Sequence, residues 1–417
     1  ALNGTNSAIS GTITVTPTAD GCSGSTETAT ITVNPTPALS STLTPAAICS
    51  GTTFAYTATS ATVASSGSTT MSWTRATIAG ITQAGTSGSG DISETLTNTT
   101  NAAINVTYQY TITSNGCSAT NDVIVSVKPT PTVDAVSAQT LCAGVTSSAI
   151  TFTSAFGVAS TTYAWSNSNT SIGLGASGTV SVPTFTALNG TNSAISGTIT
   201  VTPTADGCSG STQTATITVN PTPTVNSVSN QALCNGALTS AITFSGALPG
   251  ATYDWSNSET SIGLVATGSG DINAFPAVNS GTSNATATLT VTPTLGSCTG
   301  TATTATITVY PTPTVTDPAD QTLCAGTSTT EVTLSGAVSG TLYSWANNNT
   351  STGLAASGFG PVPAFTALNS GSTAVTSTVT VTPTLIPTAG TTYGSVSEGG
   401  TLNLIAPNGM IFTNSMK

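Results

Sequence analysis

One block of about 90 residues recurs along this chain with little change. Residues 1–37 return as residues 187–223 with a single difference, Glu27 in the first copy and Gln213 in the second. The tripeptide Pro-Thr-Pro recurs at spacings of 94, 92 and 90 residues, beginning at Pro35, Pro129, Pro221 and Pro311. Solenoid coils repeat every ~20–50 residues, so a period this long fits a complete small domain repeated in tandem.

Composition indicates a folded β-protein with an uncharged surface. Charged residues make up 4% of the chain, against roughly 25% in typical globular domains. The sequence is instead crowded with Thr, Val and Ile, which fit a pleated, half-buried surface. Apolar residues alternate in runs, as at Leu289 with Val291 and Ile307 with Val309, and turn residues separate the runs. We therefore predict an all-β chain, a tandem array of immunoglobulin-like β-sandwiches joined by Pro-Thr-Pro linkers.

The repeats predict the domain boundaries. Ala1 enters in the middle of a repeat, so the chain is expected to be a fragment of something longer. The predicted segments are 1–35 (the C-terminal part of a sandwich), 36–128 (a divergent sandwich), 129–220 and 221–310 (two sandwiches), 311–388 (a sandwich lacking its second cysteine) and 389–417 (the start of a further β-domain).

The charge inventory excludes several functions. The basic residues are Arg75, Lys128 and Lys417, histidine is absent, and the net charge is −11. Nucleic-acid binding needs several Lys or Arg to replace phosphate counterions, and a basic membrane patch needs them equally. No run approaches 18 apolar residues, so we expect no membrane insertion. Without His there is no Ser-His-Asp or Cys-His arrangement, and the carboxylates are scattered, so we expect no enzyme.

Each copy carries one tryptophan, at Trp73, Trp165, Trp255 and Trp345. Three of them lie in a Tyr-x-Trp motif that begins at Tyr163, Tyr253 and Tyr343. One Trp per sandwich is typical of a central core anchor, and we assign that role to these Trp and Tyr residues. The functional alternative is an exposed aromatic platform for stacking on sugars. The Ser-Ile-Gly-Leu that follows, with Gly173 and Gly263, predicts a tight turn whose glycine supplies an unusual backbone angle.

A metal site has little support. Asp91 and Asp271 both lie in Gly-Ser-Gly-Asp-Ile. A calcium ion wants several oxygen ligands and only one carboxylate is local, so a solvated turn is the better interpretation and calcium the alternative. We expect no other cofactor.

Eight cysteines at regular spacing predict disulfides and an oxidising compartment, and no CxxC pair suggests zinc or redox catalysis. Pairing within a repeat gives Cys49–Cys117, Cys142–Cys208 and Cys234–Cys298, leaving Cys22 and Cys324, because Thr388 stands where the partner of Cys324 should be. Pairing across the linker gives 22–49, 117–142, 208–234 and 298–324. Links between domains or between chains are a third scheme. In a standard sandwich the two cysteines of one repeat lie near opposite ends, too far apart for a bond.

Several motifs together resemble a known family. They are Leu-Cys-x-Gly, Tyr-x-Trp-Ser-Asn-x-x-Thr-Ser-Ile-Gly-Leu, Thr-Val-Thr-Pro-Thr, Gly-Cys-Ser-Gly and Val-Asn-Pro-Thr-Pro, and they cover residues 1–385. This combination resembles the PKD-like/Ig-like repeats of very large secreted surface proteins of Bacteroidetes, including gliding-motility adhesins. The resemblance implies type IX secretion, display on the outer-membrane surface, and a role in adhesion or gliding. Residues 397–412 are similar to the start of galactose-binding lectin-like domains. The copy at 36–128 departs most, with Met71-Ser72-Trp73-Thr74 in place of the Tyr-x-Trp motif.

The leading functional hypothesis is an adhesin stalk that carries a terminal binding domain away from the cell. Its partners would be an extracellular carbohydrate or substratum, bound through domains outside this chain, and the secretion and anchoring machinery. The second hypothesis is a self-assembling filament or sheath, since weak surface charge permits close packing of chains. The third is a carbohydrate-binding accessory array of a secreted enzyme, which exposed tryptophans would favour.

Overall fold

The computed structural model describes residues 1–65 and 67–385, and beyond these the backbone of two short strands at 403–405 and 411–413. Across this described part the chain is built of β-strands, turns and three one-turn 3₁₀ helices, as predicted for an all-β protein. The same residues include no helix with the length and apolar character needed to cross a bilayer. The chain divides into two compact units, Ala1–Pro221 and Thr222–Lys417, and the boundary between them in the sequence falls in the third Pro-Thr-Pro. Each sheet in the described residues takes all of its strands from a single predicted repeat. The exact residues at which the repeats begin and end stay predictions.

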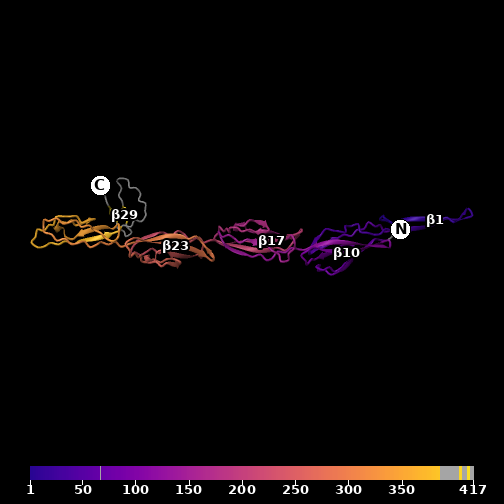
Figure 1. Ribbon diagram of the computed structural model, residues 1–417, viewed down its shortest axis with the longest axis horizontal. Helices are drawn as coiled ribbons and strands as arrows, with labels where there is room; N and C mark the ends of the chain where they lie inside the picture. Colours follow the sequence, from indigo (N-terminus) through magenta and orange to yellow (C-terminus); the bar gives the residue numbers. More distant parts are fainter. Residues whose placement is uncertain (66, 386–402, 406–410, 414–417) are drawn as a thin grey trace, which may run out of the picture. The chain divides into compact units, whose positions relative to one another are not determined.

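The first unit begins with a hairpin. Its strands β1 and β4 pair antiparallel, and β2 and β3 form a short ladder at the tip between them. β1 is labelled in Figure 1. The bounds are β1 Ile9–Val15, β2 Thr18–Ala19, β3 Cys22–Ser23 and β4 Glu27–Val33.

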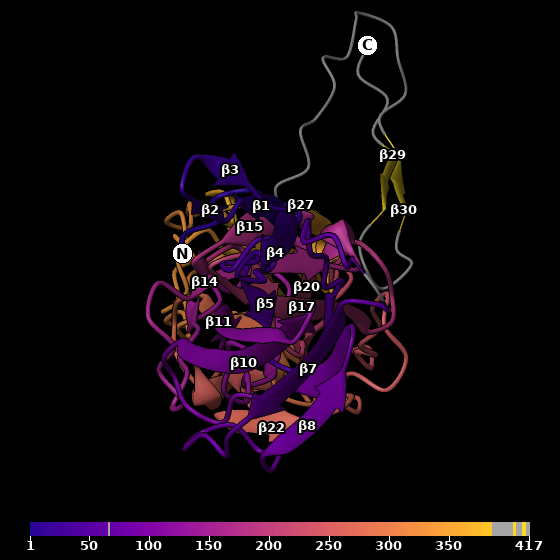
Figure 2. The ribbon, with the colours of Figure 1, turned by 90° about the vertical axis from the view of Figure 1, so that its right-hand side faces the viewer.

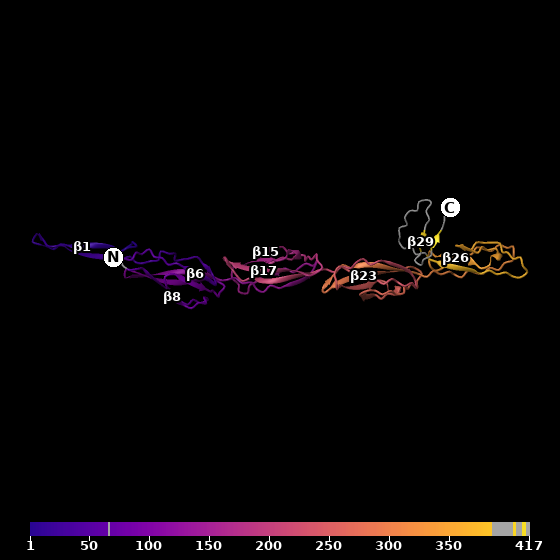
Figure 3. The same cartoon turned by 180° about the vertical axis from the view of Figure 1, so that it is seen from behind.

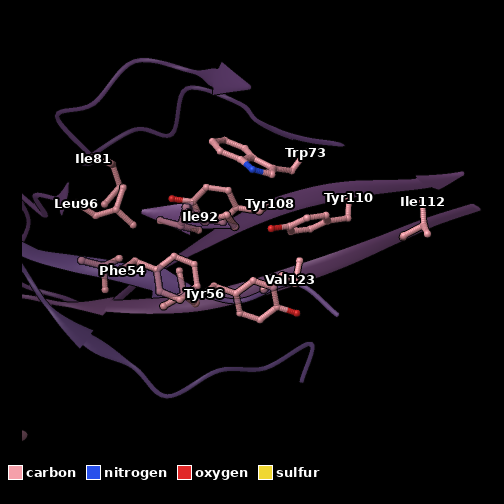
Figure 4. Close-up of a cluster of buried hydrophobic side chains, with 14 residues drawn as sticks. Phe54, Tyr56, Trp73, Ile81, Ile92, Leu96, Tyr108, Tyr110, Ile112 and Val123 are labelled. Carbon is pink, nitrogen blue, oxygen red and sulfur yellow. The ribbon is translucent and has the colours of Figure 1, made fainter. Parts of the chain in front are cut away.

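Repeat 36–128 is a sandwich of a five-stranded and a two-stranded sheet. The strands are β5 Ile48–Cys49, β6 Thr52–Tyr56, β7 Thr70–Arg75, β8 Thr86–Ser89, β9 Ile92–Leu96, β10 Ile104–Ser114 and β11 Cys117–Lys128. The larger sheet has the order β5-β11-β10-β7-β8, which can be followed in Figure 2, and the smaller one pairs β6 with β9. Alternate residues of both sheets point inward. Phe54 of β6, Trp73 of β7 and Tyr108 of β10 meet there, with the ring of Tyr108 5.5 Å from Phe54 and 5.4 Å from Trp73 (Figure 4).

Repeat 129–220 has the same plan. Its elements are β12 Gln139–Cys142, β13 Ile150–Thr151, β14 Thr162–Asn167, η1 Thr170–Ile172, β15 Ser177–Thr179, β16 Ser181–Val182, β17 Ile195–Ala205, β18 Cys208–Ser209 and β19 Gln213–Asn220. The main sheet runs β12-β19-β17-β14-β15, with β18 paired to β17, and β13 pairs with β16. Its strands β15 and β17 are labelled in Figure 3. As predicted, Gly173 ends the turn in the left-handed region, at φ 95°.

Identical sequence gives the same hairpin in two different environments. β1 pairs with β4 in the register that β17 keeps with β19, so Ile13 faces Ala29 as Ile199 faces Ala215. Yet Ile13 is 49% exposed and Ile199 is fully buried. In repeat 129–220, Trp165 and other residues preceding β17 belong to the cluster that covers this face. The hairpin is therefore a local property of the sequence, and its burial depends on the rest of a repeat.

The second unit repeats the plan again. The elements of repeat 221–310 are β20 Gln231–Cys234, β21 Thr252–Asn257, η2 Thr260–Ile262, β22 Thr267–Ser269, β23 Ala285–Leu295, β24 Cys298–Thr299 and β25 Thr303–Tyr310. Its main sheet has the order β20-β25-β23-β21-β22, and the predicted alternation is confirmed, because Leu289, Val291, Ile307 and Val309 are all buried.

The elements that follow are β26 Leu342–Asn347, η3 Thr350–Thr352, β27 Ser357–Phe359 and β28 Val379–Thr384, then β29 Asn403–Ile405 and β30 Ile411–Thr413. β29 and β30 pair antiparallel. The predicted opening strand at 397–404 lies largely outside the described residues, and the lectin-like resemblance stays a prediction.

Candidate functional site at the repeat junction

Cys49 lies at the end of repeat 36–128 that leads into the linker. Its strand β5 runs parallel to the last strand, β11, and Cys49 stands beside Lys128, the residue before Pro129. Cys142 and Cys234 occupy the same position in their repeats, beside Asn220 and Tyr310. The parallel pairing thus carries the first cysteine of each repeat to its C-terminal end.

Cys208 lies at the opposite end of its own repeat. The hairpin of β17 and β18 turns through Asp206 and Gly207, whose φ values of 48° and 83° are both left-handed. Two-residue turns with this geometry match the twist of the strands they join, and Asp-Gly is a favoured pair for them. Cys208 follows the turn directly, opposite Ala205, and is 1% exposed.

The structure joins these two positions across the junction. Cys49 and Cys208 form a disulfide with a Cα–Cα distance of 5.6 Å, linking repeat 36–128 to repeat 129–220. The predicted pairs Cys49–Cys117 and Cys142–Cys208 are therefore wrong, and so are 22–49 and 208–234. The physical reason lies in strand length: Cys142 stands beside Asn220 and Cys208 precedes Gln213, so strand β19 separates them by roughly 25 Å. A disulfide needs Cα atoms within about 7 Å.

The other cysteines follow the same positional rule. Cys142 and Cys298 are also disulfide-bonded, and they occupy the positions of Cys49 and Cys208 in their repeats. Cys22, Cys117, Cys234 and Cys324 are free thiols in the described part of the chain. The predicted pairs 117–142, 234–298 and 298–324 each combine a free cysteine with a bonded one and are wrong too. Thr388 lies outside the described residues.

Polar contacts surround the bond. The Lys128 Nζ donates to the Asp206 carbonyl oxygen at 2.7 Å, and the Thr130 Oγ1 donates to the Ser50 carbonyl at 3.3 Å. At the preceding junction Asn34, the residue before Pro35, donates from Nδ2 to the Asn115 carbonyl at 2.8 Å. In both cases the residue before the proline holds the hairpin turn of the next repeat. Sequence reasoning gave neither residue this role, although both stand directly before Pro-Thr-Pro.

The linker packs against its own repeat. A Cβ added to Gly210 would lie 1.8 Å from the Pro131 carbonyl oxygen, and one added to Gly300 would lie 1.9 Å from that of Pro223. Both glycines come two residues after the second cysteine of their repeats. The hairpin passes so close to the linker there that only the hydrogen side chain of glycine fits. This close approach fixes the direction in which the chain enters each repeat.

The aromatic residues of the Trp motif lie in the core or at its edge. The four tryptophans are 4–9% exposed, and each belongs to the central cluster of its repeat. Tyr163 and Tyr253 are half-buried and pack against the clusters of their repeats, and Tyr343 is half-buried. In the two repeats with the best-formed motif, the indole Nε1 donates to a backbone carbonyl, Ser181 for Trp165 and Gly270 for Trp255. No tryptophan therefore offers a face for stacking on a sugar.

A glycine covers each indole ring, and this predicts a sensitive position. A Cβ on Gly178 would lie 2.6 Å from Cζ2 of Trp165. Gly178→Ala is expected to lower the free energy of unfolding of repeat 129–220 by about 1–3 kcal/mol, because the ring must shift in a packed core. Urea unfolding monitored by hydrogen exchange in β14 and β17 measures this. Gly175→Ala is the matched control, since no atom lies within 4 Å of its added Cβ. Equal midpoints for the two variants would contradict the prediction.

The aspartates considered for calcium have backbone partners. Asp91 Oδ1 accepts a hydrogen bond from the Ala58 N–H at 3.0 Å, and Asp271 Oδ1 accepts one from Phe244 N–H at 2.9 Å. No group of three or more acidic or cysteine side chains suited to a metal occurs in the part of the chain that the structure describes. Both carboxylates thus tie one strand to the loop opposite, which is a structural role.

Sequence reasoning missed a buried ion pair in repeat 36–128. Arg75 is 2% exposed, and it donates from Nη2 to Glu94 Oε1 at 2.6 Å and from Nε to Oε2 at 2.9 Å. Its remaining N–H groups donate to the carbonyls of Ala76, Gln83 and Ala84. Asn167 stands at the same place after Trp165, and its Nδ2 donates to the Asn169 and Leu174 carbonyls. The residue two places after the tryptophan therefore holds the following loop, as an amide in one repeat and as a guanidinium in the other.

Glu94 also accepts a hydrogen bond from Tyr108, and this predicts alkaline sensitivity. Burial, followed by the bond to Glu94, raises the pKa of Tyr108, and burial raises that of Tyr110. The folded-state pKa lies above the unfolded value of about 10, so the stabilisation is fully present below pH ~10 and is lost as the pH rises above it. Tyrosinate absorbance should show these residues ionising only when repeat 36–128 unfolds. Tyr108→Phe should reduce the alkaline loss; an unchanged loss would contradict this account.

Comparisons with known proteins returned distant matches among solved structures. Among solved structures, three titin domains (I67–I69) share 10% identity, with 66% of this chain and 98% of that chain covered and a TM-score of 0.37. Drosophila N-cadherin EC1–4 shares 13% over 74% of this chain and 85% of that one (TM-score 0.26), and the human desmocollin-1 ectodomain 11% over 97% and 84% (TM-score 0.26). Scores this low support no inference about this chain. No curated protein matches it significantly.

The family comparison is more specific. Residues 46–131 match the model of the PKD-like domain, and they cover nearly all of the repeat that departs most in sequence. Its two-sheet plan recurs in repeat 129–220, and its main-sheet order recurs in repeat 221–310. The chain is thus an all-β tandem array of similar sandwiches, one of which, at residues 46–131, matches the PKD-like domain.

Proposed function

We propose that this chain is the stiff, repetitive stalk of a large secreted cell-surface adhesin that supports attachment to surfaces and gliding. The observation that carries the proposal is the disulfide across the repeat junction. A peptide linker alone lets two domains swivel, and inter-domain motion is the default when the interface is small. Here the backbone and the Cys49–Cys208 bond both connect the same two repeats. Two covalent connections restrict bending and twisting at the junction, which a spacer needs and an isolated binding module does not.

The surface chemistry supports an exported location. Disulfides persist in oxidising compartments outside the cytosol, and the chain holds bonded cysteines in the described part of both units. Many outward-facing strand positions carry Ser or Thr, and trypsin-like proteases find only three Lys or Arg in the sequence. On the resemblance to Bacteroidetes surface repeats, we propose export by type IX secretion and display on the outer membrane. Ligand binding would belong to domains outside this chain.

A self-assembling filament is the second candidate, and one observation favours it. The outward face of the hairpin β17–β19 carries only hydroxyl side chains, among them Ser196, Thr198 and Thr216, and the Ser196 and Thr218 hydroxyls lie 3.0 Å apart across the strands. Such a face has no charge to repel a second copy. The accessory carbohydrate-binding array has less support, because the four tryptophans are buried.

Electron microscopy of the full, non-reduced chain over a concentration series separates the two candidates. The stalk predicts single elongated particles whose length does not change with concentration. Ordered fibres or bundles that grow with concentration would contradict it and favour the filament. The same series after reduction and alkylation is the control, in which we expect a wider distribution of angles between successive repeats.

A further inference from the structure

We propose that the Cys49–Cys208 bond keeps residues 50–207 out of the path of tension, so that thiol reduction sets how far this part of the chain can be stretched. The inference takes its biological meaning from the proposed stalk function, while its physical content is independent of that function. It follows from the positions of the two bonded cysteines in the chain, and from the weakness of the hydrogen bonds that also connect the two repeats.

The bond closes a loop that contains most of two repeats. The sequence separation between the two cysteines is 159, and the loop includes every strand from β6 to β17. All of the core cluster of repeat 36–128, from Phe54 to Val127, lies inside it. Tension that arrives along the backbone at Cys49 can therefore pass through two sulfur atoms to Cys208 without crossing either core.

Opening the bond would release a large additional length of chain. While the bond is intact, the Cα atoms of Cys49 and Cys208 stay 5.6 Å apart even if both repeats unfold. Once the bond is open, the same 159 residues span roughly 525–570 Å when fully extended. Each repeat can then open under tension and lengthen the chain.

The non-covalent contacts at the junction cannot replace the bond. The hydrogen bonds across it are isolated ones at exposed or partly buried positions, from Lys128 to Asp206 and from Thr130 to Ser50, with a longer one of 3.5 Å from Asn101 to Gly157. Each such bond contributes only about 0.5–1.5 kcal/mol net. The disulfide is thus the connection that decides whether the loop is held closed.

Reduction needs a thiol donor from outside the chain, and we propose a dithiol as the reductant. Its thiolate attacks one sulfur of the bond, most directly that of Cys49, because Cys49 is half-buried and Cys208 is almost fully buried. Cys208 leaves as a thiolate and takes up a proton. The second thiol of the reagent then displaces Cys49, so that the protein gains two thiols and the reagent becomes a cyclic disulfide. The burial of Cys208 predicts slow reduction while the two repeats stay docked.

Single-molecule stretching tests the proposal on the full chain, with attachment points introduced by bio-orthogonal side chains at Thr42 and Ser211, both exposed. The oxidised chain should extend only by the few residues outside the loop. Addition of a dithiol should release an extra roughly 525–570 Å. Cys49→Ser should lengthen the chain without reductant, by less than full reduction does, because Cys142 inside the loop is itself disulfide-bonded. Cys234→Ser, which removes a thiol that is already free, should behave like the unmodified chain.

Two results would overturn the proposal. The first is that the oxidised chain already reaches full extension. The second is that reduction adds no length and the Cys49→Ser variant extends no further than the unmodified chain. The reduction experiment uses the unmodified protein, so a folding defect of the variant does not decide the outcome. Failure of the stalk function has a different signature. Concentration-dependent fibres would refute the stalk and leave the difference in extension between oxidised and reduced chains unchanged.

Discussion

Replacing Glu94 by glutamine is expected to lower the free energy of unfolding of repeat 36–128 by about 3–5 kcal/mol. Arg75 is held inside the sandwich by two bonds to the Glu94 carboxylate and by three backbone carbonyls. Glutamine keeps the shape but removes the countercharge, which leaves a guanidinium buried with no negative partner. The variant also weakens the Tyr108 hydrogen bond, because a neutral amide oxygen accepts it less strongly than a carboxylate.

Hydrogen exchange during urea titration measures this effect locally, in peptides from β10 and β11. Exchange in repeat 221–310 of the same molecule gives an internal reference. Glu331→Gln is the matched control: Glu331 is exposed, and its replacement should change stability by less than about 0.5 kcal/mol. Complete loss of protection in repeat 36–128 would be the extreme of the expected result. Unchanged protection in β10 and β11 would show that the ion pair does not hold the loop after Trp73.

The second large effect is expected from Cys49→Ser. Opening a loop with a sequence separation of 159 restores freedom to the unfolded chain, which the chain-entropy model puts at up to about 5 kcal/mol. The side chain itself is half-buried and outside the central cluster, so its replacement should disturb the packing little. We therefore expect repeats 36–128 and 129–220 to unfold at lower denaturant concentration, and the amides of their core strands to exchange faster.

Cys234→Ser provides the control for that variant. Cys234 stands beside the last strand of its repeat as Cys49 does, but it carries a free thiol. Guanidinium unfolding of the full chain, followed by exchange in β10 and β17, compares the two. A lower midpoint for Cys49→Ser alone is the expected result. Equal midpoints for both variants would mean that the bond does not restrict the unfolded chain, and the stability argument would be wrong.

Much of the fold could be predicted because its signals are local. Alternation at Leu289 and Val291 marks a strand with one face buried wherever a second layer is available, and Gly173 marks a left-handed turn. The repeated Trp also identified the core without reference to its neighbours. The identical hairpins at 9–33 and 195–219 show the limit of such signals. Their strands and register follow from the local sequence. Whether the inward-facing isoleucine is exposed, as Ile13 is, or buried, as Ile199 is, depends on residues earlier in the same repeat.

The junction could not be predicted from cysteine spacing alone. Regular spacing fits pairing within a repeat, across a linker or between domains equally well, since all three preserve the period. The deciding fact is three-dimensional: β5 runs parallel to β11 and carries Cys49 to the C-terminal end, while the hairpin turn carries Cys208 to the N-terminal end of the next repeat. The sequence also placed the two cysteines of one repeat at opposite ends, but that placement left pairing within a repeat open, and the structure is what rules those pairs out. Arg75 was missed for a different reason, because no spacing rule tells a buried arginine from an exposed one.

The most direct test of a covalently joined repeat array is disulfide mapping of the full chain. Free thiols are alkylated first, the non-reduced protein is digested with pepsin because Lys and Arg are too few for trypsin, and the linked peptides are sequenced by mass spectrometry. The structure predicts a peptide pair that contains Cys49 and Cys208, with Cys22, Cys117, Cys234 and Cys324 alkylated. Recovery of Cys49 with Cys117, or of Cys22 with Cys49, would contradict it and leave each junction with only its peptide linker.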